Sequence, residues 1–201
     1  MDDLPFSQAC ENNKQPIYEV LSRHLQGTER LLEIGGGTAQ HAEYFSKLFP
    51  GVAWQSSEIP ANLETLNQRI DRAGLPNLPS GIALDVNDDS WPVEKFDAIF
   101  SANTLHIMAS VSVVSFFYKA GAHLGETGLL LVYGPFKYGG EFTTPSNKNF
   151  DLWLKQRDPV SGIRDFEWVN SMAEGQGLRL EEDNAMPANN QLLVWKRCKS
   201  S

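Results

Sequence analysis

Apolar residues along this chain alternate between short continuous runs and longer stretches in which they recur every three or four positions. The short runs predict β-strands, and the longer stretches predict amphipathic helices. Strands are predicted at residues 30–34, 52–58, 81–86, 96–101 and 129–133. Helices are predicted at residues 16–25, 39–48, 62–73 and 105–124. In the last of these helices, the spacing predicts that the core-facing residues are Val111, Val114 and Phe117.

The alternation of strand and helix predicts a Rossmann-like, doubly wound α/β fold with helices on both faces of the sheet. Residues 178–197 predict two further strands joined by a polar turn at residues 186–190. We therefore expect a mostly parallel, seven-stranded sheet with an antiparallel last strand. The run at residues 129–133 is apolar on both faces, which is typical of a parallel sheet covered on both sides.

All 201 residues are expected to form a single domain. Residues 1–27 would supply an N-terminal helix and a lid. The segment 134–177 is rich in Gly, Pro, Asn and aromatic residues and forms an elaborated connection, with helices expected near residues 149–156 and 165–173. A connection of this length inside a compact domain is usually functional, so we expect it on the substrate side.

Charge and composition narrow the class of partner. Asp and Glu total 25 against 17 Lys and Arg, which gives a net charge of −8 and disfavours nucleic acid. The two cysteines and four histidines have no spacing typical of metal ligands, so no metal site is expected. The start MDDLPFSQAC lacks the regions of a signal peptide, and no apolar run is long enough to span a membrane. We expect a cytoplasmic protein without a membrane partner, in an oligomeric state that the sequence leaves open.

Three consecutive glycines, Gly35, Gly36 and Gly37, separate the first predicted strand from the following helix. Such a turn leaves helix N-terminal N–H groups free and lets a ligand lie against the backbone. Gly35 and Gly37 match the first two glycines of the dinucleotide fingerprint G-x-G-x-x-G, but Gln40 occupies the third position. A nicotinamide site is therefore poorly supported, and a tight turn that binds nothing remains an alternative.

Acidic residues close the next two predicted strands. Glu58 ends the second strand, where a carboxylate can bind the two hydroxyls of a ribose. Asp85 and Val86 end the third strand, where they can accept from an exocyclic amine and pack against a purine. A solvated strand end for Glu58 and a turn cap for Asp85 are the alternatives. Together with Glu33, these carboxylates indicate a ligand with hydroxyls, an adenine and a positive centre.

Four segments resemble the successive motifs of class I S-adenosylmethionine-dependent methyltransferases: LEIGGGTA (32–39), SSEI (56–59), ALDV (83–86) and FDAIFSANTLH (96–106). Five shorter motifs make the chain similar to the methyltransferase-like 26 family: ENNKQPI (11–17), YGPF (133–136), SNKNFD (146–151), DPVSGIRD (158–165) and MPANN (186–190). The resemblance implies a methyltransferase fold and S-adenosylmethionine as the cofactor. It implies no acceptor.

Carried over by motif, the resemblance implies a set of cofactor contacts. Gly35, Gly36 and Gly37 would lie under the methionine part, with Glu33 holding the turn or a water near its ammonium. Glu58 and Ile59 would contact the ribose, and Asp85 and Val86 the adenine. Asn103 would lie near the reacting methyl group. Before the first predicted helix, Asn13 and Lys14 could fold over the cofactor and meet its carboxylate. An unstructured, solvated N-terminus is the alternative.

Candidates for the acceptor side follow the fourth and fifth strands. His106 is a candidate general base and Tyr133 a second catalytic candidate, the alternative for His106 being a histidine satisfied within the helix start. Candidate substrate-binding residues are Phe136, Tyr138, Asn147, Arg164, Asp165 and Asn189. Their alternatives are a core edge for the aromatic residues, and caps, loop pairs or hairpin positions for the polar ones.

Methyl transfer from a sulfonium needs alignment of the acceptor and exclusion of water rather than a metal. The position of the D/N-P-P-Y element, found in amino-group methyltransferases of nucleic acids, reads SANTLH here. A small molecule is therefore the expected acceptor, and a protein side chain is the second. The alternative function is a non-catalytic module that binds the cofactor or a partner protein.

Overall fold

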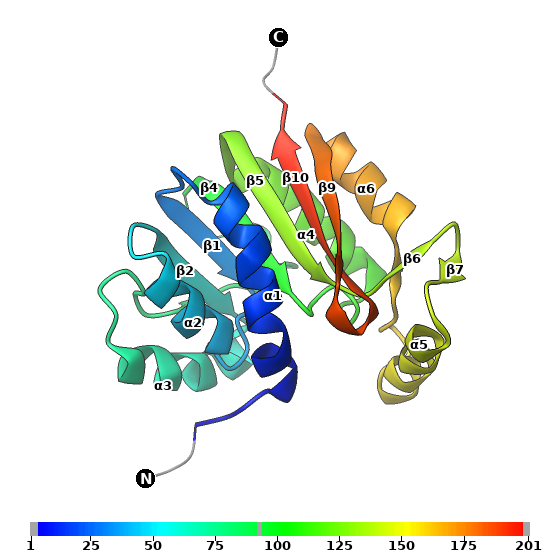
Figure 1. The fold of residues 1–201 in the computed structure, drawn as a ribbon, viewed down its shortest axis with the longest axis horizontal. Helices are drawn as coiled ribbons and strands as arrows, with labels where there is room; N and C mark the ends of the chain where they lie inside the picture. The colour runs from blue at the N-terminus through cyan, green and yellow to red at the C-terminus, as the bar shows by residue number, and fades with distance from the viewer. Residues whose placement is uncertain (1–3, 92–93, 199–201) are drawn as a thin grey trace.

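The computed structural model describes residues 4–91 and 94–198. A seven-stranded sheet in the order β3-β2-β1-β4-β5-β10-β9 forms its centre (Figure 1). Its strands are β1 (Arg30–Ile34), β2 (Ala53–Glu58), β3 (Ile82–Ala83), β4 (Phe96–Ala102), β5 (Leu124–Gly134), β9 (Leu178–Met186) and β10 (Asn190–Arg197). The first five are parallel, and β10 pairs antiparallel with both β5 and β9. The predicted fold class is confirmed.

The described residues form six α-helices: α1 (Gln8–His24), α2 (Gln40–Leu48), α3 (Leu63–Ala73), α4 (Ser110–His123), α5 (Pro145–Arg157) and α6 (Phe166–Gly175). Figure 1 shows α1, α2 and α3 on one face of the sheet and α4 and α6 on the other. Each face has its own apolar cluster, and Leu131 and Tyr133 of β5 belong to one while Leu130 and Val132 belong to the other. The central strand is covered on both sides, as its apolar run predicts.

The connection after β5 contains a second, three-stranded sheet that the sequence pattern does not predict. It consists of β6 (Phe136–Tyr138), β7 (Glu141–Phe142) and β8 (Arg164–Asp165), in the order β7-β6-β8. Helix α5 lies between β7 and β8 in the chain and projects from the edge of the molecule (Figure 1). Strands of two or three residues carry too short an alternation to be recognised from sequence.

Helix α1 begins earlier than predicted. The prediction starts it at Pro16, whereas the helix starts at Gln8 and Pro16 lies inside it. Ser7 is the N-cap, and its Oγ accepts from the Cys10 N–H at 3.3 Å, which satisfies one of the free donors of the first turn. The residues expected to form a separate lid, Asn13 and Lys14, are therefore helical.

Helix α4 begins later than predicted and faces the core differently. Residues 105–109 form a turn, and the helix starts at Ser110. Val111 is 72% exposed and Val114 48% exposed, so the prediction of both as core residues is wrong, while Phe117 is buried as predicted. Apolar residues lie on several faces of this helix. Its buried stripe has the spacing i, i+3, i+4, i+7 and consists of Val113, Phe116, Phe117 and Ala120.

Across residues 4–91 and 94–198, no helix is both long enough and apolar enough to cross a bilayer.

Candidate functional site

A cavity of about 540 Å³ lies at the carboxyl ends of β1, β2 and β4. This volume is within the range of small-molecule sites, and the position between β1 and β4 is the point at which the strand order reverses. Three segments that begin at the last residues of these strands line it: residues 34–38, 58–59 and 102–104. The remaining lining comes from Ser7, Ala9, Cys10, His41, Asn62, Leu84, Asp85, Val86, Asn87, Ile107, Met108 and Ser112. We refer to this cavity as the cleft.

One side of the glycine turn packs against β2, and the other side is open to the cleft. The N–H groups of Gly35 and Gly36 both donate to the Ser57 carbonyl, at 3.1 and 2.9 Å. A Cβ on Gly36 would lie 2.2 Å from Ser56 Oγ, whereas one on Gly37 would meet nothing within 4 Å. The turn is thus a cradle that a side chain would fill, which fits a ligand lying directly on the backbone.

Glu58 is fixed at the edge of this cradle. Its Oε2 accepts from the Gly37 N–H at 2.8 Å, and its Oε1 accepts from the Ile59 N–H at 3.0 Å. Both Glu58 and Ile59 line the cleft. A carboxylate oriented by two backbone donors keeps further lone pairs for a ligand, so its position suits recognition of paired hydroxyls.

Asp85 and Val86 lie on the same cleft, just beyond the two-residue strand β3. Asp85 Oδ1 accepts from the Asn87 N–H at 2.8 Å and from the Asn87 side-chain amide at 2.9 Å. This local cap is the alternative that the sequence left open, and it coexists with a place in the cleft lining. The buried Val86 gives the neighbouring wall an apolar surface.

Asn103 follows β4 and also lines the cleft. Its φ of 60° lies in the left-handed region, and its N–H donates to the Tyr133 carbonyl at 2.9 Å. The next residue, Thr104, packs so closely on the glycine turn that a Cβ on Gly35 would lie 2.5 Å from Thr104 Cγ2. A strained non-glycine residue at a cleft is typical of a functional loop.

The first turn of α1 forms the opposite wall through Ser7, Ala9 and Cys10. Asn13 does not line the cleft, but its Oδ1 lies 2.7 Å from Nε2 of the cleft-lining His41. Lys14 pairs with Glu11 at 2.5 Å and lies outside the cleft. The structure therefore corrects the predicted lid, because the α1 residues that reach the cleft lie one turn before those chosen from the sequence.

The two catalytic candidates are not brought to the cleft. His106 packs on the ring of Phe150, with ring centroids 5.4 Å apart, and burial lowers its pKa to about 4, with Arg164 contributing. Tyr133 belongs to the α1 side of the core, where burial raises the pKa of its hydroxyl and the influence of Asn13 and Asn190 opposes the rise. Neither lines the cleft.

The six substrate-binding candidates also lie away from the cleft lining: Phe136, Tyr138, Asn147, Arg164, Asp165 and Asn189. Arg164 donates to the carbonyls of Leu105 and Met108, so it braces the turn before α4. Asn147 donates to the Asn189 carbonyl at 2.9 Å, which ties α5 to the turn before β10.

The other members of this set have partners within the protein. Tyr138 donates to Asp183 at 2.7 Å, Asp165 pairs with Lys137 at 3.1 Å, and Phe136 is buried in the core. The polar residues among the six match the structural alternatives of loop pairs and caps. In the described part of the chain, no three His, Cys, Asp or Glu residues gather in a way that could hold a metal ion.

The family described as "Protein of unknown function (DUF938)" matches residues 4–197. The chain belongs to this family. The narrower resemblance to the methyltransferase-like 26 family stays a prediction, since the matching family carries a different description.

Among curated proteins, the DUF938 chain is similar to the bacteriochlorophyllide d C-20 methyltransferase of Chlorobaculum tepidum. The two are 23% identical over 152 residues, which cover 75% of this chain and 43% of that protein. The chain therefore spans less than half the length of this relative. The relation is distant, and what the relative acts on is a property of that protein.

Solved structures share the fold of the DUF938 chain. An O-methyltransferase family protein from Burkholderia thailandensis superposes with a TM-score of 0.83 at 15% identity, over 96% of this chain and 58% of that one. The S-adenosylmethionine-dependent methyltransferase SibL superposes with a TM-score of 0.78 at 22% identity, over 95% of this chain and 56% of that one. The structure described as "PigF with SAH" superposes with a TM-score of 0.77 at 14% identity, over 93% of this chain and 56% of that one. At these identities the likeness shows a common methyltransferase-type Rossmann fold, which this chain forms at little more than half their length.

The DUF938 cleft also contains residues that the sequence reading missed, among them Ser7, Cys10, Thr38 and His41. Ser7 carries a usable signal, because serine is a preferred N-cap and a helix from residue 8 would bring its first turn to the end of the fold that holds the glycines. His41 carries none, since its place in the cleft depends on how α2 packs against α1. Burial, with a contribution from Lys14, lowers the pKa of His41 to about 4, so it is neutral near pH 7.

Glu33 lies beneath the glycine turn and outside the cleft lining. Its Oε2 accepts from Ser56 Oγ at 2.7 Å and from Trp54 Nε1 at 3.1 Å. Burial raises the pKa of this carboxyl, the two donors oppose the rise, and the nearby Glu58 adds to it. In this position Glu33 joins β1 to β2, and both roles that the resemblance implies for it stay predictions.

Replacing Glu33 by Gln is expected to increase the free energy of unfolding at neutral pH, because an amide oxygen can accept the same two bonds without a buried charge. The folded state retains the Glu33 proton to a higher pH than the unfolded state. The wild type therefore loses stability as the pH rises from 4.5 through the folded-state pKa, and Glu33→Gln lacks this decline. Urea unfolding from about pH 4 to pH 8 measures it. Parallel stability curves for the two proteins would contradict it, and Glu64→Gln on the exposed side of α3 is the control.

Proposed function

We propose that this DUF938 protein binds S-adenosylmethionine in the cleft and transfers its methyl group to a small-molecule acceptor. The proposal is carried by one observation: the carboxylates of Glu58 and Asp85 lie on the same cleft as the bare backbone of the glycine turn. These groups come from three separate strand ends, and together they match a nucleoside with a sugar, an amine-bearing base and a cationic substituent.

Each part of the cofactor has residues that would hold it. The turn at residues 35–37 would lie under the methionine part, with Asn103 beside it. Glu58 would accept from the ribose hydroxyls, with Ile59 next to the sugar. Asp85 would accept from the adenine amine, while Val86 packs against the ring. Among the described residues that line the cleft there is no Lys or Arg, which favours a ligand that carries a positive charge.

The cofactor supplies an activated methyl group on a sulfonium, so little covalent chemistry is left to the protein. The chain's own contribution is to orient the acceptor, exclude water and neutralise charge. The first turn of α1 closes one wall of the cleft beside the glycine turn, which supports a role in excluding water. A protein side chain remains the second acceptor class.

The relatives support this proposal without deciding the acceptor. The Chlorobaculum tepidum protein and SibL are both named as methyltransferases, and PigF is described with SAH. Calorimetry on the purified full chain tests the proposal: S-adenosylhomocysteine should bind with a stoichiometry of one, and NADH should give no binding and no shift in melting temperature. Absence of S-adenosylhomocysteine binding would overturn it.

A non-catalytic cofactor-binding module is the second candidate, and a specific observation favours it. Neither His106 nor Tyr133 lines the cleft, and the histidine that does, His41, has its pKa lowered to about 4. An acceptor that must lose a proton therefore lacks an obvious base. Incubation with hydroxyl, thiol and amine acceptors separates the two functions, since continuous release of S-adenosylhomocysteine with any acceptor identifies an enzyme.

A further inference from the structure

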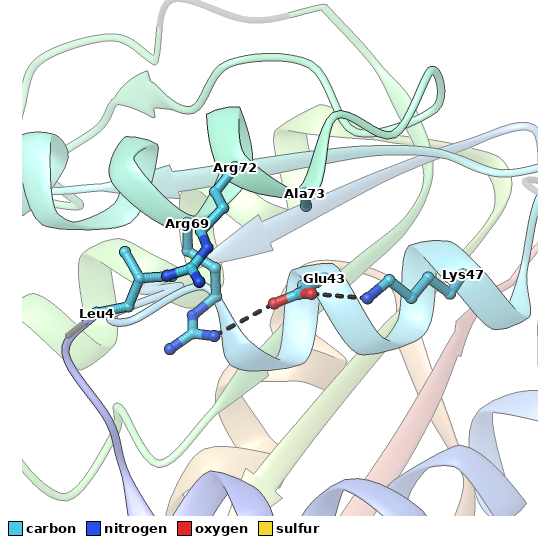
Figure 2. A pocket seen from close by; sticks show the side chains of 6 residues that line it. All are labelled: Leu4, Glu43, Lys47, Arg69, Arg72 and Ala73. Atoms are coloured by element: carbon cyan, nitrogen blue, oxygen red, sulfur yellow. Dashed lines mark hydrogen bonds and ion pairs between the residues drawn. The ribbon is translucent and has the colours of Figure 1, made fainter. Parts of the chain in front are cut away.

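The segment Leu4–Ser7, which we call the strap, leads into the first turn of α1 and contacts α3 through the bond between Pro5 and Arg69. A second cavity, of about 420 Å³, lies beside it on the outer surface. Figure 2 shows Leu4 next to Arg69 and Arg72 of α3, with Glu43 and Lys47 on α2. Leu4 and Pro5 are thus held at this outer cavity, while Ser7 at the end of the strap and the helix turn that follows it line the cleft.

Arg69 joins three parts of the molecule at this cavity. Its Nη2 donates to the Pro5 carbonyl of the strap at 2.7 Å, and its Nε donates to the carbonyl of Thr38 at 2.7 Å. Its Nη1 pairs with Glu43 at 3.2 Å, drawn as a dashed line in Figure 2. The guanidinium is a rigid fork with fixed donor directions, so one side chain fixes the strap relative to the end of the glycine turn.

Gln40 makes the second connection. Its Oε1 accepts from the Ser7 N–H at 2.5 Å and from Thr38 Oγ1 at 3.0 Å, and its Nε2 donates to the Ser7 carbonyl at 3.3 Å. Ser7 is the N-cap of α1, so these bonds fix the point at which the helix begins. Gln40 is also the residue that replaces the third glycine of the dinucleotide fingerprint, and the structure gives that departure a function.

Thr38 connects both contacts to the cleft. It lines the cleft directly after Gly37, and it contacts both Arg69 and Gln40. The first turn of α1, with Ala9 and Cys10, forms the wall that faces this turn. The bonds of Arg69 and Gln40 to the strap therefore hold this wall of the cleft in place beside the glycine turn.

We propose that Arg69 and Gln40 are positioning residues that hold the first turn of α1 over the methionine part of the bound cofactor and so set how long the cofactor is retained. The inference rests on the proposed function. It assigns to a buried amide and an outer-surface arginine a role in cofactor retention, although neither lines the cleft.

Arg69→Gln and Gln40→Glu test this role. The first removes the fork, and the second keeps an acceptor for the Ser7 N–H but replaces the donor to the Ser7 carbonyl by a repelling oxygen. Hydrogen exchange of the amides of residues 6–10 in the ligand-free protein should quicken about tenfold in either variant, and stopped-flow dissociation of S-adenosylhomocysteine should quicken by about the same factor. Arg72→Gln is the matched control: it removes a guanidinium from the same helix and cavity, and within the described residues no hydrogen bond joins Arg72 to the strap.

The outcomes separate this proposal from the one on which it rests. A wild type that binds S-adenosylhomocysteine, with variants whose dissociation rate is unchanged, overturns the positioning role alone, even if exchange in the strap quickens. Equal effects of Arg72→Gln and Arg69→Gln overturn it as well, because they reduce it to surface charge. A wild type that fails to bind S-adenosylhomocysteine overturns the proposed function and cofactor retention together. Melting temperatures show whether a variant has lost its fold. If Arg69→Gln does not fold, the dissociation rate of Gln40→Glu alone tests the positioning role.

Discussion

Glu58→Gln is expected to weaken binding of S-adenosylhomocysteine about a hundredfold, which corresponds to ~2.7 kcal/mol. Two losses combine in this variant. An amide presents a single acceptor oxygen, so it cannot serve the N–H groups of Gly37 and Ile59 as the two carboxylate oxygens do. It also offers no charged acceptor to the ribose hydroxyls. Calorimetric titration with S-adenosylhomocysteine measures the effect.

The fold should survive this change, because Glu58 ends β2 at the rim of the cleft and forms no ion pair among the described residues. Glu64→Gln removes the same charge from the exposed first turn of α3 and is the control for the loss of one negative charge. Retention of affinity within about threefold in Glu58→Gln would remove the basis of the proposed cofactor site. An equal loss in both variants would point to long-range electrostatics instead.

Much of the fold can be predicted from the sequence, because each element of the sheet carries its own local signal. The triple glycine ends β1, the run at residues 129–133 is apolar on both faces, and the polar turn at residues 187–189 separates the last two strands. Right-handed crossovers then leave few ways of arranging the parallel strands. The carboxylates at strand ends follow from the same logic, since the carboxyl ends of parallel strands meet at one rim.

The errors arise where the outcome depends on packing between distant elements. Tyr133 lies in a strand buried on both faces, so its apolar run does not reveal which face it occupies, and its side chain belongs to the cluster on the α1 side. The spacing predicts a helix that includes His106, but the helix begins at Ser110, and the turn that holds His106 is braced from β8 by Arg164. Contacts between residues more than fifty positions apart leave no local pattern to read.

One wall of the cleft can be predicted from the sequence and the other cannot. The wall made by strand ends is predictable, while the wall made by α1 is not, because it depends on the bonds from Gln40 and Arg69 that fix where the helix begins. Pro16 is a strong local signal for a first helical position, yet the core contacts of Ile17, Val20 and Leu21 keep the helix continuous across it. Tertiary packing here outweighs a single-residue preference.

Alanine substitutions in the glycine turn are expected to separate stability from binding. In Gly36→Ala the new Cβ would lie 2.2 Å from Ser56 Oγ and 2.7 Å from Leu66 Cδ1, inside a packed layer that also contains Glu33. Overpacking of this kind costs about 2 kcal/mol of unfolding free energy, which lowers the melting temperature by roughly 4–8 °C in a chain of this size. Calorimetric melting of the ligand-free protein measures it.

Gly37→Ala should mainly lower the affinity for S-adenosylhomocysteine, with a smaller loss of stability than Gly36→Ala. Gly139→Ala is its matched control. Gly37 and Gly139 have φ values of 56° and 57°, and a Cβ on either would meet nothing within 4 Å, so both alanine variants should lose a similar ~1 kcal/mol to left-handed backbone strain. Gly37 lines the cleft and Gly139 does not, so S-adenosylhomocysteine affinity should fall in Gly37→Ala alone. If the two variants bind equally well, the ligand does not lie on this turn, and the three glycines serve only the close packing of β1 against β2.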